Sequence, residues 1–255
     1  MSIQSFIYVL CFVLFALLQT RETFVFGAQG ITYLEIGANN GAWTVSKMKD
    51  ATTALKTTCF MFEPQPHLFS QLSAIATSYN CSVVTRPAWT HEAEMEFHVH
   101  QDDVASSLIP GLLSKKNDTS KPKTFNVPTI DLALWISKNV DPKDFVHVRM
   151  DIEGAEYMVL RRLIVTGVAC KYFNVLEVEF HALHTKSNYA MRPADVVLPW
   201  ILRGCGMKVL HAAYYPKELY DMTGDSPCNE CELLKTILPN TPGGQGEKLV
   251  NEAYP

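Results

Sequence analysis

The chain has no surplus of basic charge and no long tract of one residue type. Its 22 Lys and Arg residues against 26 Asp and Glu residues give a formal net charge of -4. Nucleic-acid-binding proteins usually carry a basic surplus, so we expect no nucleic-acid partner. Apolar residues make up 47% and charged residues 19%, a composition that excludes global disorder. The chain also lacks internal repeats, and its 255 residues suit one sizeable α/β domain.

The N-terminal segment before Arg21 lacks charged residues altogether. Within it, the apolar run 6–18 has the length of the hydrophobic region of a signal peptide and is short for a bilayer span. No Lys or Arg precedes the run, so a signal anchor and a buried N-terminal helix stay open as alternatives. We expect residues 1–27 to be a signal peptide or signal anchor. The protein would then be secreted or lie in the ER or Golgi lumen, with single-pass membrane anchoring as the alternative and an uncleaved anchor as its only membrane contact.

Cysteine usage favours the same compartment. Removal of Cys11 with the leader leaves six cysteines, which is compatible with three disulfides. Cys59 and Cys81 lie on two predicted neighbouring parallel strands and are the pair we favour. Cys228 and Cys231 have the C-x-x-C spacing, but without a second pair of ligands they indicate a disulfide or free thiols rather than a zinc site.

Two acceptor sequons, at Asn80 and Asn117, would be glycosylated only if the chain enters the secretory lumen. Together with the leader and the cysteines, they predict a secreted, disulfide-bonded glycoprotein.

Apolar runs that resemble short buried strands alternate with helical patterns. The strand-like runs are 31–37, 57–63, 81–88, 145–152 and 173–180. The helical patterns are 42–51, 66–78, 130–139 and 154–165, and a helix at 193–203, a strand at 207–212 and a final antiparallel strand at 231–238 follow. The alternation predicts an α/β, Rossmann-like doubly wound fold, with a mostly parallel sheet and helices on both faces.

We expect the folded domain to span residues 28–240 and a loose tail to span 241–255. The segments 93–100 and 124–129 look like added strands around a polar loop at 101–123. This loop is either a lid over a binding site or a solvent-exposed insertion.

A glycine-containing turn, Glu35-Ile36-Gly37-Ala38-Asn39-Asn40-Gly41, lies between the first predicted strand and helix. Gly37 and Gly41 permit a tight turn and a close backbone approach to a ligand, and the following helix begins with free N–H groups. The dinucleotide fingerprint G-x-G-x-x-G is missing, and this spacing argues against a nicotinamide cofactor and hence against an oxidoreductase. Glu35 could bind a cationic ammonium group.

An acidic residue, Glu63, ends the second strand-like run. A nucleotide-binding fold of this type places an acidic residue there to accept hydrogen bonds from the two ribose hydroxyls. The glycine turn and Glu63 together therefore predict a nucleotide-type cofactor.

Five segments in order resemble the motifs of FkbM-like methyltransferases, a class I S-adenosylmethionine-dependent group: EIGANNG, FEPQP, VPTIDLAL, RMDIEGAEYMVL and VLEVEFH. The resemblance spans residues 33–184. It implies a Rossmann-like sheet, S-adenosyl-L-methionine as the methyl donor and, typically, an oxygen acceptor. Departures from the family pattern are Glu35 in place of Asp, Asn40 in place of an aliphatic residue and Arg149 in place of Lys.

The resemblance also implies a role for individual residues. Glu35, Gly37, Asn39 and Gly41 would surround the methionine part of the cofactor, Glu63 the ribose, and Ala88 and Trp89 the adenine. Asp151 and Glu153 would line the cleft beside the reactive methyl group, with Glu179 and His181 following the fifth strand.

Transfer of a methyl group to a hydroxyl benefits from alignment and from a base. His181 is one candidate base because its reference pKa of about 6.5 lies near working pH. Asp151 competes with it, and Glu179 belongs to the same predicted catalytic group. The alternatives are a surface position for His181 and a helix-capping role for Asp151. We assign no metal, although Asp151, Glu179 and His181 could hold a divalent ion, and we give Glu156 a structural role.

These observations predict an S-adenosylmethionine-dependent methyltransferase that modifies a hydroxyl of a sugar, a glycan or a small molecule. The alternative is a secreted, non-catalytic binding protein that keeps the same fold.

Overall fold

A computed structural model describes residues 28–51, 55–99, 106–110, 123–181 and 192–211. The leader, the loop centre at 111–122, the predicted strand at 231–238 and the tail at 241–255 lie outside these residues, as do Asn117, Cys228 and Cys231. None of the helices in the described part of the chain combines the length and the apolar content that a membrane span requires.

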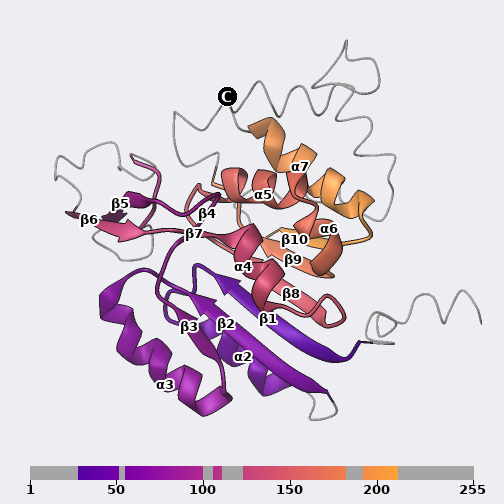
Figure 1. The fold of residues 1–255 in the computed structure, drawn as a ribbon, viewed down its shortest axis with the longest axis horizontal. Helices are drawn as coiled ribbons and strands as arrows, with labels where there is room; N and C mark the ends of the chain where they lie inside the picture. Colours follow the sequence, from indigo (N-terminus) through magenta and orange to yellow (C-terminus); the bar gives the residue numbers. More distant parts are fainter. Residues whose placement is uncertain (1–27, 52–54, 100–105, 111–122, 182–191, 212–255) are drawn as a thin grey trace, which may run out of the picture.

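A six-stranded parallel sheet forms the centre of the molecule (Figure 1). Its strands lie in the order β10-β9-β8-β1-β2-β3. Their bounds are Gly30–Ile36 for β1, Lys56–Phe62 for β2, Ser82–Val84 for β3, Phe145–Met150 for β8, Val175–Val178 for β9 and Lys208–His211 for β10. The fold is therefore the predicted Rossmann-like α/β fold with a mostly parallel sheet.

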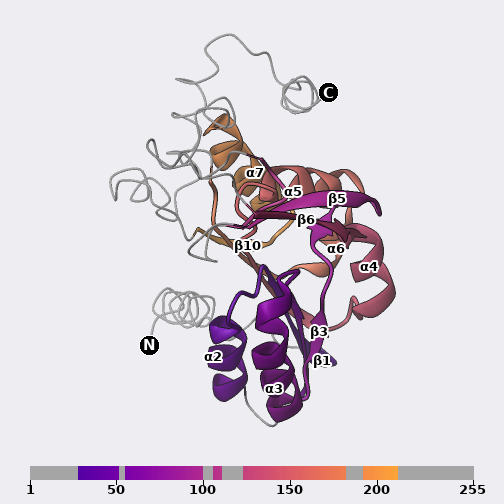
Figure 2. The same ribbon diagram turned by 90° about the vertical axis from the view of Figure 1, so that its left-hand side faces the viewer.

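The helices form two groups around the sheet. Helix α2 (Ala42–Asp50) and helix α3 (Phe69–Tyr79), which follows the 3-10 turn η2 (Pro66–Leu68), pack together beside β1 and β3 (Figure 2). The second group comprises α4 (Leu132–Asn139), α5 (Glu156–Val165), α6 (Val168–Tyr172) and α7 (Arg192–Gly204).

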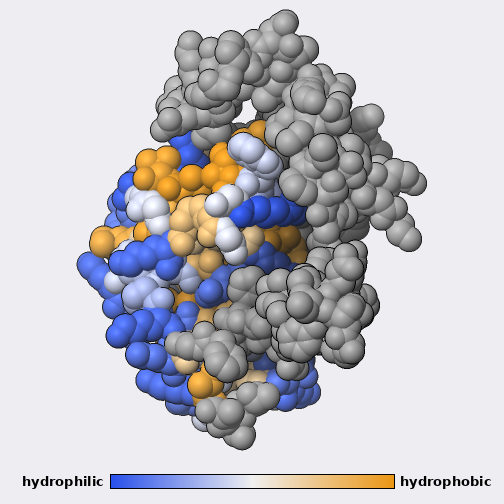
Figure 3. All heavy atoms as spheres, turned by 90° about the vertical axis from the view of Figure 1, so that its right-hand side faces the viewer, coloured by the Kyte–Doolittle hydropathy of each residue, from blue (hydrophilic) through white to orange (hydrophobic). Residues whose placement is uncertain are grey.

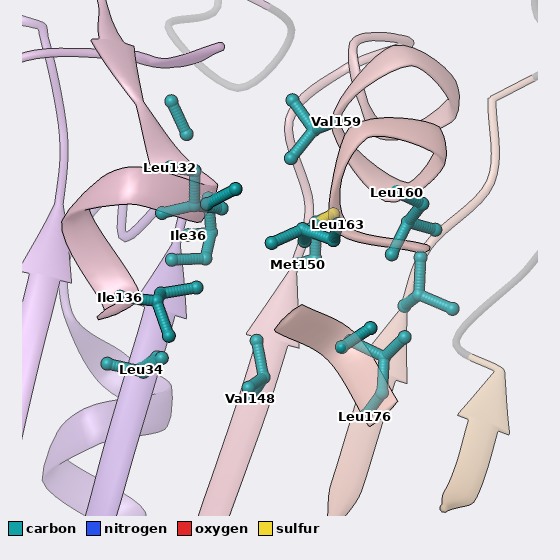
Figure 4. Packing of buried hydrophobic residues seen from close by; sticks show 14 of the residues in the cluster. Leu34, Ile36, Leu132, Ile136, Val148, Met150, Val159, Leu160, Leu163 and Leu176 are labelled. Atoms are coloured by element: carbon teal, nitrogen blue, oxygen red, sulfur yellow. The ribbon is translucent and has the colours of Figure 1, made fainter. Parts of the chain in front are cut away.

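The main core lies between the sheet and the second group of helices (Figure 4). Alternate residues of the central strands point toward it, because successive side chains of a strand face opposite sides of a sheet. Leu34, Ile36, Val148, Met150 and Leu176 are all fully buried in this way, against residues of α4 and α5. Burial of such side chains stabilises a fold by roughly 1.5–3 kcal/mol each.

Two small sheets accompany the main one. Strand β5 (Glu94–Val99) pairs antiparallel with β6 (Lys123–Pro128), as the added strand material predicted. Strand β4 (Ala88–Trp89) pairs with β7 (Ile130–Asp131). The predicted strand at 81–88 is therefore wrong as one element: its first half pairs with β2 and its end leaves the main sheet.

The predicted helix at 130–139 begins two residues later than expected. Ile130 and Asp131 belong to β7, and Asp131 caps α4 by accepting a hydrogen bond from the Leu134 amide at 3.2 Å. The side chain of a capping residue satisfies an amide that has no partner within the helix.

Two disulfides join the described cysteines. Cys59 on β2 is bonded to Cys81 before β3, as predicted, and Cys170 on α6 is bonded to Cys205 after α7. Disulfides persist in oxidising compartments, so this pattern is consistent with an extracellular or secretory location.

The exposed surface is mixed. On the face drawn in Figure 3, apolar residues gather toward the upper part of the described surface, and hydrophilic residues predominate below them. Among the described residues, the large exposed apolar side chains are Leu134, Val165, Trp200 and Leu210, which lie on four different elements.

Candidate functional site

The order in which the chain adds strands to the sheet reverses between β1 and β8. Strands β2 and β3 follow β1 outward on one side, whereas β8, β9 and β10 extend on the other. In open parallel sheets, such a switch point leaves a crevice at the carboxyl ends of the strands. The Asp151 amide donates to the Ile36 carbonyl at 2.9 Å, so the turns after β1 and β8 lie in contact there.

The turn after β1 depends on left-handed backbone conformations. Gly37 has φ 86°, Asn39 φ 46° and Gly41 φ 72°. A Cβ added at Gly37 would lie 1.9 Å from the Asp151 carbonyl oxygen, so only glycine fits there. The close backbone approach that Gly37 permits is therefore made to the Asp151 backbone of the protein itself.

The carboxylate of Glu63 links this turn to the end of β2. It accepts hydrogen bonds from the Asn39 amide at 2.8 Å and from the Gln65 amide at 3.0 Å. The residue is only 3% exposed. Burial raises the pKa of Glu63, although the two amide hydrogen bonds oppose this shift.

Glu35 lies behind the turn and holds helix α2. Its Oε2 atom accepts hydrogen bonds from the Thr44 hydroxyl at 2.7 Å and from the Thr44 amide at 3.2 Å. Burial raises the pKa of Glu35 to about 7, while the Thr44 bonds and the charge of Arg149 lower it in part. Glu35 does not line the cleft that lies in front of this turn.

A cleft of about 650 Å³, including its open mouth, lies at the switch point. The structure brings six of the predicted site residues together along its wall: Gly37, Asn39, Glu63, Ala88, Asp151 and Glu153.

The other predicted residues lie outside this lining. Gly41 is the N-cap residue that precedes α2, and a Cβ added there would lie 2.8 Å from the Ile75 side chain. Trp89 is buried in the core next to Ala88. Glu179 and His181 follow β9, and His181 lies behind Asp151 and Glu153, the two acidic residues that line the cleft.

Several lining residues carry no sequence pattern that predicts a ligand. Gln65 is buried inside the FEPQP motif, and the Ser106 hydroxyl donates to its Oε1 atom at 3.1 Å. Leu108 and Phe97 add apolar surface. The loop at 101–123 was expected to be either a lid over a binding site or a solvent-exposed insertion. Ser106 and Leu108 line the cleft, which favours a role of this loop in the binding site.

A second strained turn follows β8. Glu153 has φ 54° although it is not glycine, and Gly154 follows with φ 97°. Two side chains hold this turn: the Ser107 hydroxyl donates to the Glu153 carbonyl at 2.7 Å, and Glu156 accepts from the Gly154 amide at 2.7 Å. Positive φ at a residue such as glutamate is uncommon and is concentrated at functional sites.

His181 is buried rather than exposed as the surface alternative held. Its side chain is 5% exposed and lies among carboxylates: Nδ1 lies 2.9 Å from Glu156, and Nε2 lies 3.2 Å from Glu153 and 3.8 Å from Asp151. Glu156 also accepts from the His181 amide at 2.9 Å. The structural role given to Glu156 therefore consists in fixing both the turn and the imidazole.

The crowding of carboxylates perturbs several of these groups. Burial lowers the pKa of His181, but the hydrogen bond and charge of Glu156, with the charges of Glu153 and Asp151, raise it to about 9. Burial raises the pKa of Glu153 to about 7. Burial and the charge of Asp151 also raise the pKa of Glu179.

Asp151 has two different carboxylate oxygens. Its Oδ2 atom pairs with Arg149 at 3.1 Å, whereas Oδ1 is buried and has no hydrogen-bond partner among the described residues. One atom each of Asp151, Glu153 and His181 lies within 4.8 Å of the other two, so this group could hold a cation.

Comparison with known families assigns the class. A family model, the methyltransferase FkbM domain, matches residues 35–209. This covers more than half of the chain, so the protein belongs to the FkbM methyltransferase family. Membership confirms the resemblance found in the motifs and makes methyl transfer the activity that the chain's family suggests. No curated protein and no solved structure matches the chain.

Proposed function

We propose that the protein is an S-adenosyl-L-methionine-dependent O-methyltransferase of the secretory pathway, acting on a glycan or small-molecule hydroxyl. The observation that carries the proposal is the link from Glu63 to the Asn39 amide. It holds an acidic side chain at the end of β2 beside the glycine turn after β1, on one wall of one cleft. This is the arrangement that a nucleoside cofactor requires of a doubly wound fold.

In this proposal the cofactor lies along the switch point. The methionine part contacts the turn at Gly37 and Asn39, and the ribose hydroxyls donate to Glu63. The adenine reaches Ala88, which lines the same cleft. S-adenosyl-L-methionine then supplies an electrophilic methyl group on its sulfonium.

The protein's own groups align the acceptor and receive its proton. Methyl transfer is an in-line attack, so holding the acceptor hydroxyl against the methyl group supplies much of the acceleration. Asp151 is the best placed of the predicted base candidates, because it lines the cleft, whereas Glu179 and His181 lie outside the lining. His181 lies behind Asp151 and Glu153 and pairs with both carboxylates.

The acceptor assignment rests on the family resemblance and on the predicted compartment. Two disulfides, the apolar leader and the exposed sequon at Asn80 support a luminal protein, where glycan hydroxyls are available.

A labelled-methyl assay tests the activity. The purified chain is incubated with methyl-labelled S-adenosyl-L-methionine and a panel of glycans and hydroxylated small molecules, and transfer is compared for wild type and Asp151→Asn. We expect the variant to lose about 10²–10⁴-fold in kcat/KM, the usual contribution of a general base. Asp50→Asn, an exposed change at the end of α2, is the matched control. No transfer to any oxygen acceptor, or equal rates for Asp151→Asn and wild type, would contradict the proposal.

A further inference from the structure

Four carboxylates surround one imidazole at the exit of β8 and β9: Asp151, Glu153, Glu156 and Glu179. The nearby cation is Arg149, which pairs with Asp151. Even when the imidazole of His181 is protonated, only two positively charged side chains, His181 and Arg149, lie beside these four carboxylates among the described residues. Such an excess of negative charge in a partly buried wall favours the binding of a further cation.

We infer that this wall is a divalent-metal site, in which Asp151 Oδ1, Glu153 Oε2 and His181 Nε2 are the protein ligands. The histidine makes this more than a cluster of acids, since imidazole is a common ligand of transition metals, which displace the proton from the coordinating nitrogen.

The distances fit ligands on one side of a metal ion. His181 Nε2 lies 3.2 Å from Glu153 Oε2 and 3.8 Å from Asp151 Oδ1, and the three atoms lie within 4.8 Å of one another. At metal–ligand distances of roughly 2.1 Å, two ligands at right angles are about 3.0 Å apart and two opposite ones about 4.2 Å. The first two separations lie between these limits, so a small movement of the acidic side chains completes the set.

The groups around the proposed ligands also support a metal site. Metal-binding histidines typically direct their second ring nitrogen at a carboxylate, which fixes the ring and its tautomer. The fully buried Glu156 does this for His181 Nδ1 at 2.9 Å. Asp151 Oδ1 is a buried acceptor without a hydrogen-bond partner among the described residues, and it lies on the side of the carboxylate that faces His181.

The open side of such a site faces the cleft, because Asp151 and Glu153 line it and His181 does not. An oxygen of the acceptor could therefore complete the coordination and lose its proton more readily. This consequence rests on the proposed methyl transfer, whereas the binding of the cation does not.

The ligand set selects among ions. Two carboxylates and one imidazole suit Mn²⁺ and related transition metals, whereas Ca²⁺ takes oxygen ligands. A preference for Mn²⁺ over Ca²⁺ therefore distinguishes coordination by His181 from a general attraction of cations to acidic groups.

Calorimetric titration of the full chain with Mn²⁺, without S-adenosyl-L-methionine, tests the inference. We expect one saturable site per chain, tighter for Mn²⁺ than for Ca²⁺. Glu153→Gln should weaken Mn²⁺ binding by at least about 10-fold, since even changes around the ligands cost that much. Asp151→Asn is a second ligand variant, and circular dichroism shows that each variant is folded.

Glu179→Gln is the matched control, because it removes one negative charge beside the same imidazole, 3.9 Å from Nε2, but no proposed ligand. It should weaken Mn²⁺ binding less than Glu153→Gln does, because the loss of a neighbouring charge costs less than the loss of a ligand. Absence of saturable binding, tighter binding of Ca²⁺, or equal losses for Glu153→Gln and Glu179→Gln would overturn the inference. Binding of S-adenosyl-L-methionine is measured separately, so failure of the metal site would leave the proposed function standing.

Discussion

Replacing the buried Glu35 by glutamine should stabilise the protein at neutral and alkaline pH. Glu35 is 3% exposed, and burial raises its pKa from 4.5 to about 7. Glutamine has nearly the same shape and keeps an oxygen that can accept the hydrogen bonds from Thr44. It carries no charge, so the free energy spent on burying the ionised carboxylate disappears.

The sign and size follow from linkage between protonation and folding. A carboxyl group whose pKa is raised in the folded state binds protons more tightly there than in the unfolded chain. Its favourable contribution is present below the unfolded pKa of 4.5 and is lost as the pH rises toward 7. The free energy of unfolding of Glu35→Gln, relative to wild type, should therefore increase by about 2.5 kcal/mol between pH 5 and pH 8.

Urea unfolding followed by tryptophan fluorescence at pH 5 and pH 8 gives this difference. Glu94→Gln, an exposed change on β5, is the control and should show no pH-dependent difference from wild type. A Glu35→Gln variant whose relative stability does not change with pH would refute the account of this residue.

Three further changes test other parts of the structure. Gly37→Ala should destabilise the protein by roughly 3 kcal/mol or more in urea unfolding, because its Cβ would overlap the Asp151 carbonyl. Replacing Cys59 and Cys81 by alanine should cost about 3 kcal/mol by the same measurement, as expected for a loop closed over 22 residues; unchanged stability would mean that the bridge does not form. Asn80→Gln should remove one glycan when the chain is expressed through the secretory pathway, and an unchanged mass would contradict luminal entry.

The motifs predicted the layered fold because hydrophobic periodicity and turn chemistry are local properties. The strand at 31–37 and the helix at 42–51 appear within one residue of their expected bounds. The run at 81–88 was misread as one strand because pairing partners decide where a strand ends. The pairing of Ala88 with Ile130 depends on residues far along the chain.

The site was harder to predict for the same reason. Glu63 and Asp151 end strands, so topology alone brings them to one edge of the sheet. The burial of His181 and the dual role of Glu156 depend on how two separate turns pack together. A helical pattern places Glu156 on a helix but does not show that its carboxylate points inward.

Calorimetry of S-adenosyl-L-methionine binding to the purified wild-type chain and to Glu63→Ala tests whether the cleft holds this cofactor. We expect saturable binding to wild type and a loss of at least about 10-fold for Glu63→Ala, since a hydrogen bond to a charged group is worth roughly 1.5–3 kcal/mol. Glu94→Ala on the exposed face of β5 should bind as wild type does. No binding by folded wild-type protein would contradict the account and favour a non-catalytic binding protein with the same fold.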